Sequence, residues 1–134
     1  MGKFFDDHQM NAYAPAQPKR NIICLCGSTK FKQEYERENK RLSLEGNVVL
    51  SVSGFHHADD YPLTDDQKTL LDLVHKSKID LADEIFVLNV GGYVGQSTMS
   101  EITYAMSHGK IVRYLEPADT TLTLYYEPII QEQQ

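Results

Sequence analysis

The segment from Asn89 to Ala105, NVGGYVGQSTMSEITYA, contains the residues best suited to chemistry. It runs from an apolar stretch through glycines into an expected helix whose first turn carries Glu101. A glycine turn at the carboxyl end of a parallel strand is a common ligand site, and free N–H groups at a helix start favour an anion such as phosphate. A carboxylate beside that site suggests chemistry on a phosphorylated or sugar-bearing small molecule. The structural alternative is a capping box, because Thr98 and Glu101 are three residues apart.

A second candidate phosphate-binding turn, GSTK, follows the first apolar stretch. Gly27 permits close backbone approach, and Lys30 offers a positive charge. Ser28 and Thr29 offer hydroxyl groups between them. The turn has neither Walker A spacing nor the glycine pattern of dinucleotide-binding proteins. Ser28 or Thr29 could also cap the next helix, and a capped helix start can still bind an anion.

The elements that must position these turns alternate along the chain. The expected strands are Asn21–Cys26, Asn47–Ser53, Glu84–Val90 and Ile111–Leu115. The expected helices are Thr29–Leu44, a helix that starts at Thr64 with Gln67 completing its capping box, and Thr98–His108. Gly46 and Gly109 are placed to end the first and third helices. Strand and helix in alternation predict a three-layer α/β fold, Rossmann-like (flavodoxin-like), with a parallel sheet of four to five strands and helices on both faces.

The apolar positions indicate which helix faces point inward. For the first helix we expect Phe31, Tyr35, Leu42 and Leu44. For the second we expect a stripe of Leu70, Leu71, Leu73, Val74, Ile79 and Leu81. Residues 1–20, with two prolines and no periodicity, are expected to form a flexible arm before a single domain of residues 21–134. The stretch LTLYY could be a last strand or a last helix.

Composition narrows the class of function. The 134 residues carry a formal charge of −6, which argues against a nucleic-acid polymer as partner. No apolar run is long enough to span a membrane, and the start lacks the features of a secretory signal, so we expect a cytoplasmic protein without membrane association. Cys24 and Cys26 should share one face of a strand, where a disulfide between them is geometrically poor. With no other cysteine, a structural zinc site of the usual thiolate kind is not expected, and buried reduced thiols are.

Three stretches together resemble the nucleoside 2-deoxyribosyltransferase superfamily. They are CGSTKF after the first strand, DLADEIFVLNV as the third, and GQSTMSEITYAMSHGK after it. The superfamily includes hydrolases that split nucleoside 5′-monophosphates at the N-glycosidic bond, and the similarity covers roughly residues 21–116. The glycine turn is also similar to the PGGxGTxxE motif of the cytokinin-activating phosphoribohydrolases, through Gly91, Gly92, Thr98 and Glu101, with a longer spacing before Thr98.

The resemblance implies roles for individual residues. Glu101 would be the carboxylate that attacks or stabilises the anomeric carbon in an oxocarbenium-like transition state. The turn of Gly27, Ser28, Thr29 and Lys30 would line the nucleotide site. Ser97 and Thr98 would hold the sugar or its 5′-phosphate. The resemblance further implies a homodimer or higher homo-oligomer and no metal or organic cofactor.

The chain departs from the family pattern at two acids. Transferases often have Asp six residues before the nucleophilic Glu, and here that position is Gly95, which leaves room for a 5′-phosphate that an acid would repel. A second acid usually lies eight residues before the Asp that opens the third strand. Here that position is His75, which could protonate the leaving base or could be a partly exposed helix residue. Asp72 and Asp80 lie nearby in the sequence but off that spacing.

Other side chains are candidates for contact with the base. His56 and His57 lie in the loop FHHADD, whose residue types suit a metal but whose adjacent histidines lack ligand spacing. We therefore expect either contacts to the base or a solvated loop there. Tyr93 could stack on a nucleobase, and Tyr104 could fix the rotamer of the Glu101 carboxylate.

The sequence thus predicts an enzyme that cleaves, by hydrolysis or possibly transfer, the N-glycosidic bond of a nucleoside or nucleoside 5′-monophosphate. The missing acids keep a second hypothesis open, a non-catalytic module that binds or senses a nucleotide on the same fold.

Overall fold

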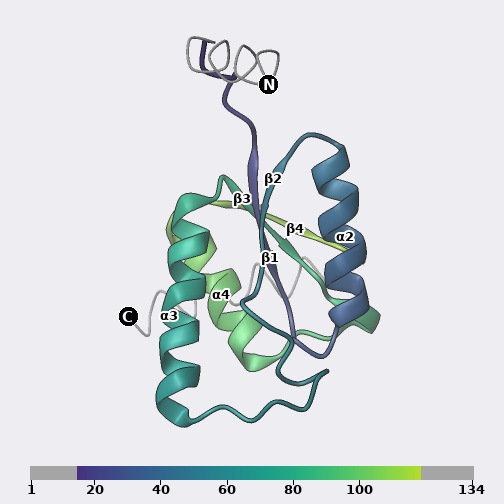
Figure 1. The fold of residues 1–134 in the computed structure, drawn as a ribbon, viewed down its shortest axis with the longest axis vertical. Coiled ribbons are helices and arrows are strands. Elements are labelled where there is room, and N and C mark those ends of the chain that lie inside the picture. The colour runs from purple at the N-terminus through teal and green to yellow at the C-terminus, as the bar shows by residue number, and fades with distance from the viewer. Residues whose placement is uncertain (1–14, 119–134) are drawn as a thin grey trace, which may run out of the picture.

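The computed structural model describes residues 15–118, and within them the chain forms a parallel sheet flanked by helices (Figure 1). The strands are β1 (Ile22–Cys26), β2 (Val48–Leu50), β3 (Glu84–Val87) and β4 (Ile111–Tyr114). The helices are α2 (Lys32–Leu44), α3 (Asp65–Leu81), α4 (Gln96–Ser107) and the short 3-10 turn η1 (Val90–Gly92). All strand pairs are parallel, in the order β2-β1-β3-β4. This confirms the predicted α/β class and the four predicted strands.

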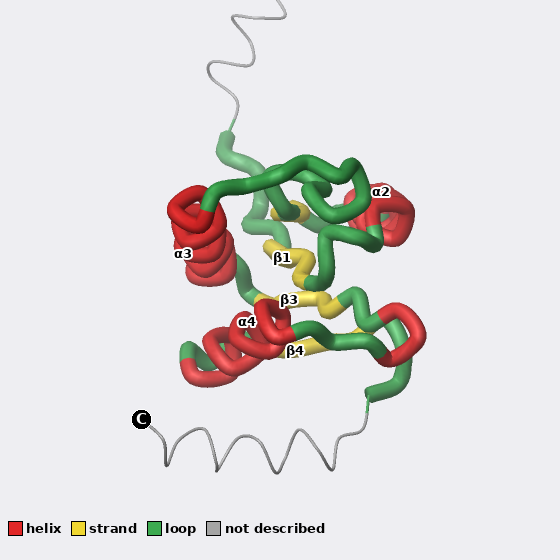
Figure 2. Tube along the Cα trace, turned by 90° about the horizontal axis from the view of Figure 1, so that it is seen from below, coloured by secondary structure: helices red, strands yellow, loops and turns green. Residues whose placement is uncertain are grey.

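The helices cover both faces of the sheet. Seen from below, α2 lies on one side of the strands, and α3 and α4 lie on the other (Figure 2). Because successive strand residues point to opposite faces, β1 contributes to two separate cores. Ile23 and Leu25 pack with Tyr35 of α2, whereas Cys24 and Cys26 pack on the α3 and α4 side. The buried and unpaired state of both cysteines agrees with the sequence prediction.

Most of the helix ends lie where the capping residues in the sequence predicted them. The Thr64 side chain accepts a hydrogen bond from the Gln67 backbone N–H, and the Gln67 side-chain oxygen accepts one from the Thr64 backbone N–H, so the capping box is present. Gly46 and Gly109 follow α2 and α4 with φ of 96° and 72°, a conformation that favours glycine.

The predicted apolar stripe of α3 is partly wrong. Ile79 is fully buried, but the side chains of Leu70, Leu73, Val74 and Leu81 are exposed. Within residues 15–118 the helix packs chiefly against β1 and α4, and these apolar side chains lie outside the buried part of that contact. Leu44, the last residue of α2, is likewise 78% exposed.

The start of α4 differs from the prediction in a way that matters for the site. The helix begins at Gln96 rather than Thr98, with Gly95 as its N-cap and no side-chain cap. Glu101 therefore lies in the second turn, not the first. Thr98 is not the capping residue, so the capping-box interpretation of Thr98 and Glu101 is wrong.

The two ends of the domain are less regular. Residues 15–20 of the predicted arm contain no helix or strand, and Lys19 forms an exposed ion pair with Asp83. The rest of the arm and the stretch LTLYY lie outside the described residues. Among the helices of the described part, none has the length and apolar character needed to cross a membrane.

Candidate functional site

A pocket of about 280 Å³ opens where the carboxyl ends of the strands meet. The chain goes from β1 to β2 on one side and then crosses to β3 on the other, and open α/β sheets bind ligands at such a reversal. The pocket is lined by residues 27–29 after β1, by the loop between residues 52 and 57 after β2, by one face of α3, and by residues between 93 and 101. The GSTK turn, the loop that contains His56 and the segment that leads to Glu101 therefore meet in one pocket.

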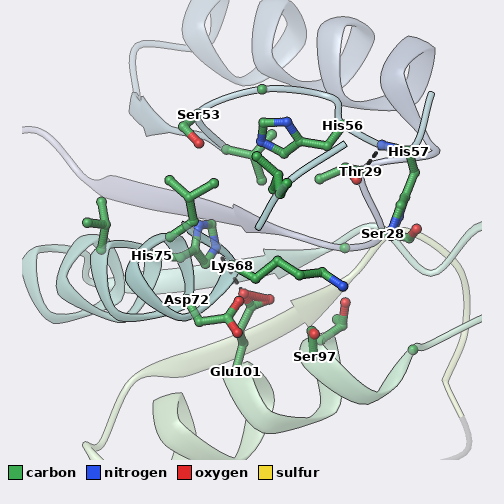
Figure 3. Close-up of a pocket in the computed structure, with 18 of the residues that line it drawn as sticks. Ser28, Thr29, Ser53, His56, His57, Lys68, Asp72, His75, Ser97 and Glu101 are labelled. Carbon is green, nitrogen blue, oxygen red and sulfur yellow. Dashed lines mark hydrogen bonds and ion pairs between the residues drawn. The ribbon is translucent and has the colours of Figure 1, made fainter. Parts of the chain in front are cut away.

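Glu101 directs its carboxylate into this pocket (Figure 3). Its side chain is 14% exposed, so the group is largely desolvated but still reachable. Burial raises the pKa of Glu101 to about 7, although the neighbouring charge of His75 opposes the rise. A carboxylate with this pKa is ionised in a substantial fraction of molecules at neutral pH and is available as a base or nucleophile.

His75 is the immediate partner of Glu101, and the alternative of a partly exposed helix residue is wrong. Its ring is buried, and its Nε2 lies 3.5 Å from Glu101 Oε2. The same nitrogen lies 3.6 Å from Cys24 Sγ and 3.5 Å from Cys26 Sγ. Burial by itself lowers the pKa of His75, but the hydrogen bond to Cys24 and the charge of Glu101 outweigh it and leave the pKa raised. A protonated His75 favours the ionised form of Glu101.

Three further charged residues of α3 line the pocket, Lys68, Asp72 and Lys78, and none was selected from the sequence. One face of α3 carries Lys68, Asp72, His75 and Ile79, which are spaced at i, i+4, i+7 and i+11. Ile79 is buried in the core, and the other three residues line the pocket. Lys68 extends across the pocket toward Ser97, and Asp72 lies beside Glu101 (Figure 3). The charge of Asp72 contributes to the raised pKa of Glu101, which agrees with this proximity.

The turn after β1 contributes three of its four predicted residues. Gly27, Ser28 and Thr29 line the pocket. A Cβ atom at residue 27 would lie 3.1 Å from the Cβ of Leu88, so glycine allows this turn to pack against the end of β3. Lys30 is not among the lining residues, because its Nζ sits 3.7 Å from the centre of the Tyr93 ring.

The start of α4 also faces the pocket. Gly95, Ser97 and Thr98 all line it, and the helix N-terminus has no side-chain cap to compete with a ligand. Backbone N–H groups at such a terminus attract anions. The glycine pair itself does not line the pocket: Gly91 and Gly92 form η1, and the Gly91 N–H donates to a carboxylate oxygen of Glu116. The two glycines through which the turn resembles the PGGxGTxxE motif therefore lie outside the pocket lining.

His56 and Tyr93 both line the pocket, as predicted for residues that contact a base. The Nε2 atom of His56 is buried and has no hydrogen-bond partner within the described part of the chain, so it remains open to a ligand. Tyr104, by contrast, does not hold the Glu101 carboxylate. Its hydroxyl donates a 2.6 Å hydrogen bond to Asp80, on the outer side of α3 and α4.

Three side chains have donor atoms placed to share a metal ion. The thiols of Cys24 and Cys26 and a ring nitrogen of His75 lie within 4.8 Å of one another, and all three residues are buried. The loop at His56 and His57 supplies no comparable group among the residues described.

Comparison of the chain with protein-family models, with curated proteins and with solved structures gives no significant match. The functional interpretation therefore depends on the fold and on the geometry of the pocket.

Proposed function

We propose that this protein hydrolyses the N-glycosidic bond of a nucleoside 5′-monophosphate. The observation that carries the proposal is Glu101, a largely buried carboxylate that faces an open pocket at the reversal point of a parallel sheet. A carboxylate facing an empty cavity, rather than its own backbone, is free to approach a substrate carbon. The resemblance in sequence to glycosidic-bond-cleaving enzymes supports the same reaction class.

Glu101 is the proposed nucleophile. Attack of its ionised oxygen on C1′ forms a glycosyl ester and breaks the bond from C1′ to the base nitrogen, through an oxocarbenium-like transition state. The departing base takes up a proton. A water molecule then attacks C1′ and gives up a proton to the group that protonated the base, which releases ribose 5-phosphate and returns the carboxylate to Glu101.

Asp72 is better placed than His75 to donate the proton to the base. The Nε2 atom of His75 faces Glu101 and the two thiols inside the protein. Asp72 is exposed and lines the pocket, so its carboxylate can take a proton from water and pass it to a bound base. His75 then acts through Glu101, as a positioning residue that holds the carboxylate and favours its ionised form.

This assignment predicts how the pH profile responds to His75→Gln. Base release requires ionised Glu101, so it should rise with pH through the pKa of Glu101, which is about 7. Because the charge of His75 lowers that pKa, removal of the ring should raise the pKa further and move the rising limb to higher pH. The check is kcat/KM from pH 5 to 9 for both proteins. If the rising limb lies at the same pH in the variant, His75 does not act on the pKa of Glu101. If kcat/KM falls by the same factor at every pH, the substitution has damaged the structure.

Lys68 is the proposed ligand of the 5′-phosphate. It is exposed, it crosses the pocket toward Ser97, and no hydrogen bond or ion pair to another described residue occupies its amine (Figure 3). The other lysine in the lining, Lys78, donates to the Ser51 carbonyl at 2.6 Å and is already engaged. The start of α4 supplies backbone donors on the same side of the pocket.

For Lys68→Met we expect KM for a nucleoside 5′-monophosphate to rise about 10- to 100-fold, because the phosphate loses one charge-assisted hydrogen bond. The nucleoside without phosphate should be cleaved as before, because it makes no use of the amine. Lys40→Met, an exposed lysine of α2, is the matched control. An equal loss on both substrates would assign Lys68 to the sugar or to folding.

Two further expectations from the sequence belong to the proposal, hydrolysis rather than transfer and a homo-oligomer. Gly95 lines the pocket where transferases of the similar family carry an acid, so no carboxylate at residue 95 repels a phosphate, and we propose hydrolysis rather than base transfer. The exposed apolar side chains of α3 are the surface on which we place the proposed homo-oligomer contact.

The direct test of the proposal is incubation of the protein with a panel of nucleosides and nucleoside 5′-monophosphates, both ribo and 2′-deoxy. Chromatography should detect free base and sugar phosphate in equal amounts. Tight binding in a calorimetric titration with no base released over hours would instead identify a non-catalytic nucleotide-binding module.

A further inference from the structure

The two cysteines and His75 form a buried cluster that the proposed reaction does not use in full. Cys24 and Cys26 are adjacent positions on one face of the central strand β1, and His75 projects from α3 onto the same face. Both cysteines have no exposed surface, and His75 is 6% exposed. Three donor atoms therefore come together from two rigid elements, with Glu101 on the pocket side of His75.

The spacing of these atoms is that of ligands around one zinc ion. With a Zn–S bond of about 2.3 Å, a Zn–N bond of about 2.0–2.1 Å and tetrahedral angles, a sulfur and a nitrogen ligand lie about 3.6 Å apart. The two observed distances from His75 Nε2 to sulfur are 3.6 Å and 3.5 Å. All three donor atoms fall within 4.8 Å of one another. The arrangement needs little rearrangement to accept an ion.

We propose that Cys24, Cys26 and His75 bind one thiophilic divalent ion of the zinc class. The fourth position opens toward the pocket, where the Glu101 carboxylate or a water molecule completes the tetrahedron. From the sequence we expected no thiolate zinc site, because two cysteines are too few. That reasoning considered sulfur ligands alone and left out His75, which follows Cys26 by 49 residues.

The chemistry of the donors favours such an ion over hard cations. Two thiolates and an imidazole suit zinc, whereas magnesium and calcium prefer oxygen ligands. The hydrogen bond from Cys26 is the largest of the effects that lower the pKa of Cys24, whereas the same hydrogen bond and burial raise the pKa of Cys26. The Cys26 proton leaves to solvent when its sulfur binds the ion, so affinity should increase with pH.

Occupation of the site has a consequence that depends on the proposed function. The ion takes His75 Nε2 away from Glu101, and it draws the carboxylate toward the metal when Glu101 is the fourth ligand. Zinc should therefore inhibit base release reversibly, and a chelator should restore it. Metal binding itself does not depend on catalysis, and it is measured from the absorption spectrum of the bound ion.

The experiment titrates the metal-free full chain with Cd²⁺ and Co²⁺ and records absorption spectra. Because the chain has two cysteines in all, a thiolate-to-cadmium charge-transfer band must come from Cys24 or Cys26. We expect one equivalent to saturate the band, and we expect Co²⁺ to give the intense visible bands of tetrahedral coordination. Competition with a chromogenic chelator then gives the Zn²⁺ affinity.

His75→Ala should weaken Zn²⁺ binding at least about 100-fold, more than the loss of a residue that only supports a ligand. His108→Gln, which removes an exposed imidazole at the end of α4, is the matched control and should bind as the unaltered protein does. Absence of the charge-transfer band in the unaltered protein would overturn the proposal without any variant. A band with unchanged affinity in His75→Ala would overturn the assignment of the histidine. Zinc binding without base release would separate this inference from the proposed glycosidase.

Discussion

Glu101→Gln should reduce the release of base from a nucleoside 5′-monophosphate by at least about 1,000-fold, the scale of losing a group that acts on the reacting atoms. The amide keeps the size of the side chain and its place in α4, but it is a poor nucleophile and carries no charge to stabilise an oxocarbenium-like transition state. Substrate binding should survive, because the phosphate and the base contact other residues.

The measurement is single-turnover base release together with calorimetric binding of the same nucleotide. Glu36→Gln, an exposed glutamate on α2, is the matched control and should keep the rate of the unaltered protein. If the Glu101 variant retains most of its activity, the carboxylate is not the nucleophile and the mechanism proposed above is wrong.

Asp72→Asn should produce the second large effect, a loss of about 100-fold or more in base release, which is the contribution of a general acid. The effect should depend on the leaving group. A base that is already cationic in the nucleotide, as in 7-methylguanosine 5′-monophosphate, departs without a proton from the protein. The variant should therefore cleave that substrate nearly as fast as the unaltered protein does, while it cleaves guanosine 5′-monophosphate far more slowly.

The comparison uses the ratio of kcat/KM for the two nucleotides in each protein. Asp66→Asn, in the first turn of the same helix and outside the pocket lining, should leave the ratio unchanged. An equal loss on both nucleotides would show that Asp72 does not donate the proton, and His75 would return as the candidate acid.

Much of the fold followed from local signals in the sequence. Alternating apolar strands and capped helices gave the order of the elements, and the parallel arrangement brought the predicted strand-end segments into one pocket. The capping box at Thr64 was readable because it depends only on residues four positions apart or fewer. Solvent exposure was less predictable. Leu73 and Leu81 look like core residues in the sequence, but which part of α3 is buried is a tertiary property.

In the site, too, features that depend on local sequence were predicted and features that depend on tertiary contacts were not. Glu101 was found because it follows a recognisable turn, although its helix begins two residues earlier than expected. Asp72 was passed over because it does not fit the family spacing to Asp83, and Lys68 was not considered. A polar i, i+4, i+7 series of Lys68, Asp72 and His75, on the same helix face as the apolar Ile79, was the signal that could have found both. The contact between His75 and the two cysteines joins distant parts of the chain, and no local pattern predicts it.

The most direct test of the central claim is a crystal structure of the Glu101→Gln variant with a nucleoside 5′-monophosphate bound. The account predicts that C1′ lies within about 3.5 Å of the side chain of residue 101, the separation of reacting atoms poised for attack. It also predicts the phosphate at Lys68 and the start of α4. A nucleotide bound elsewhere, or bound in the pocket with its sugar turned away from residue 101, would contradict the account.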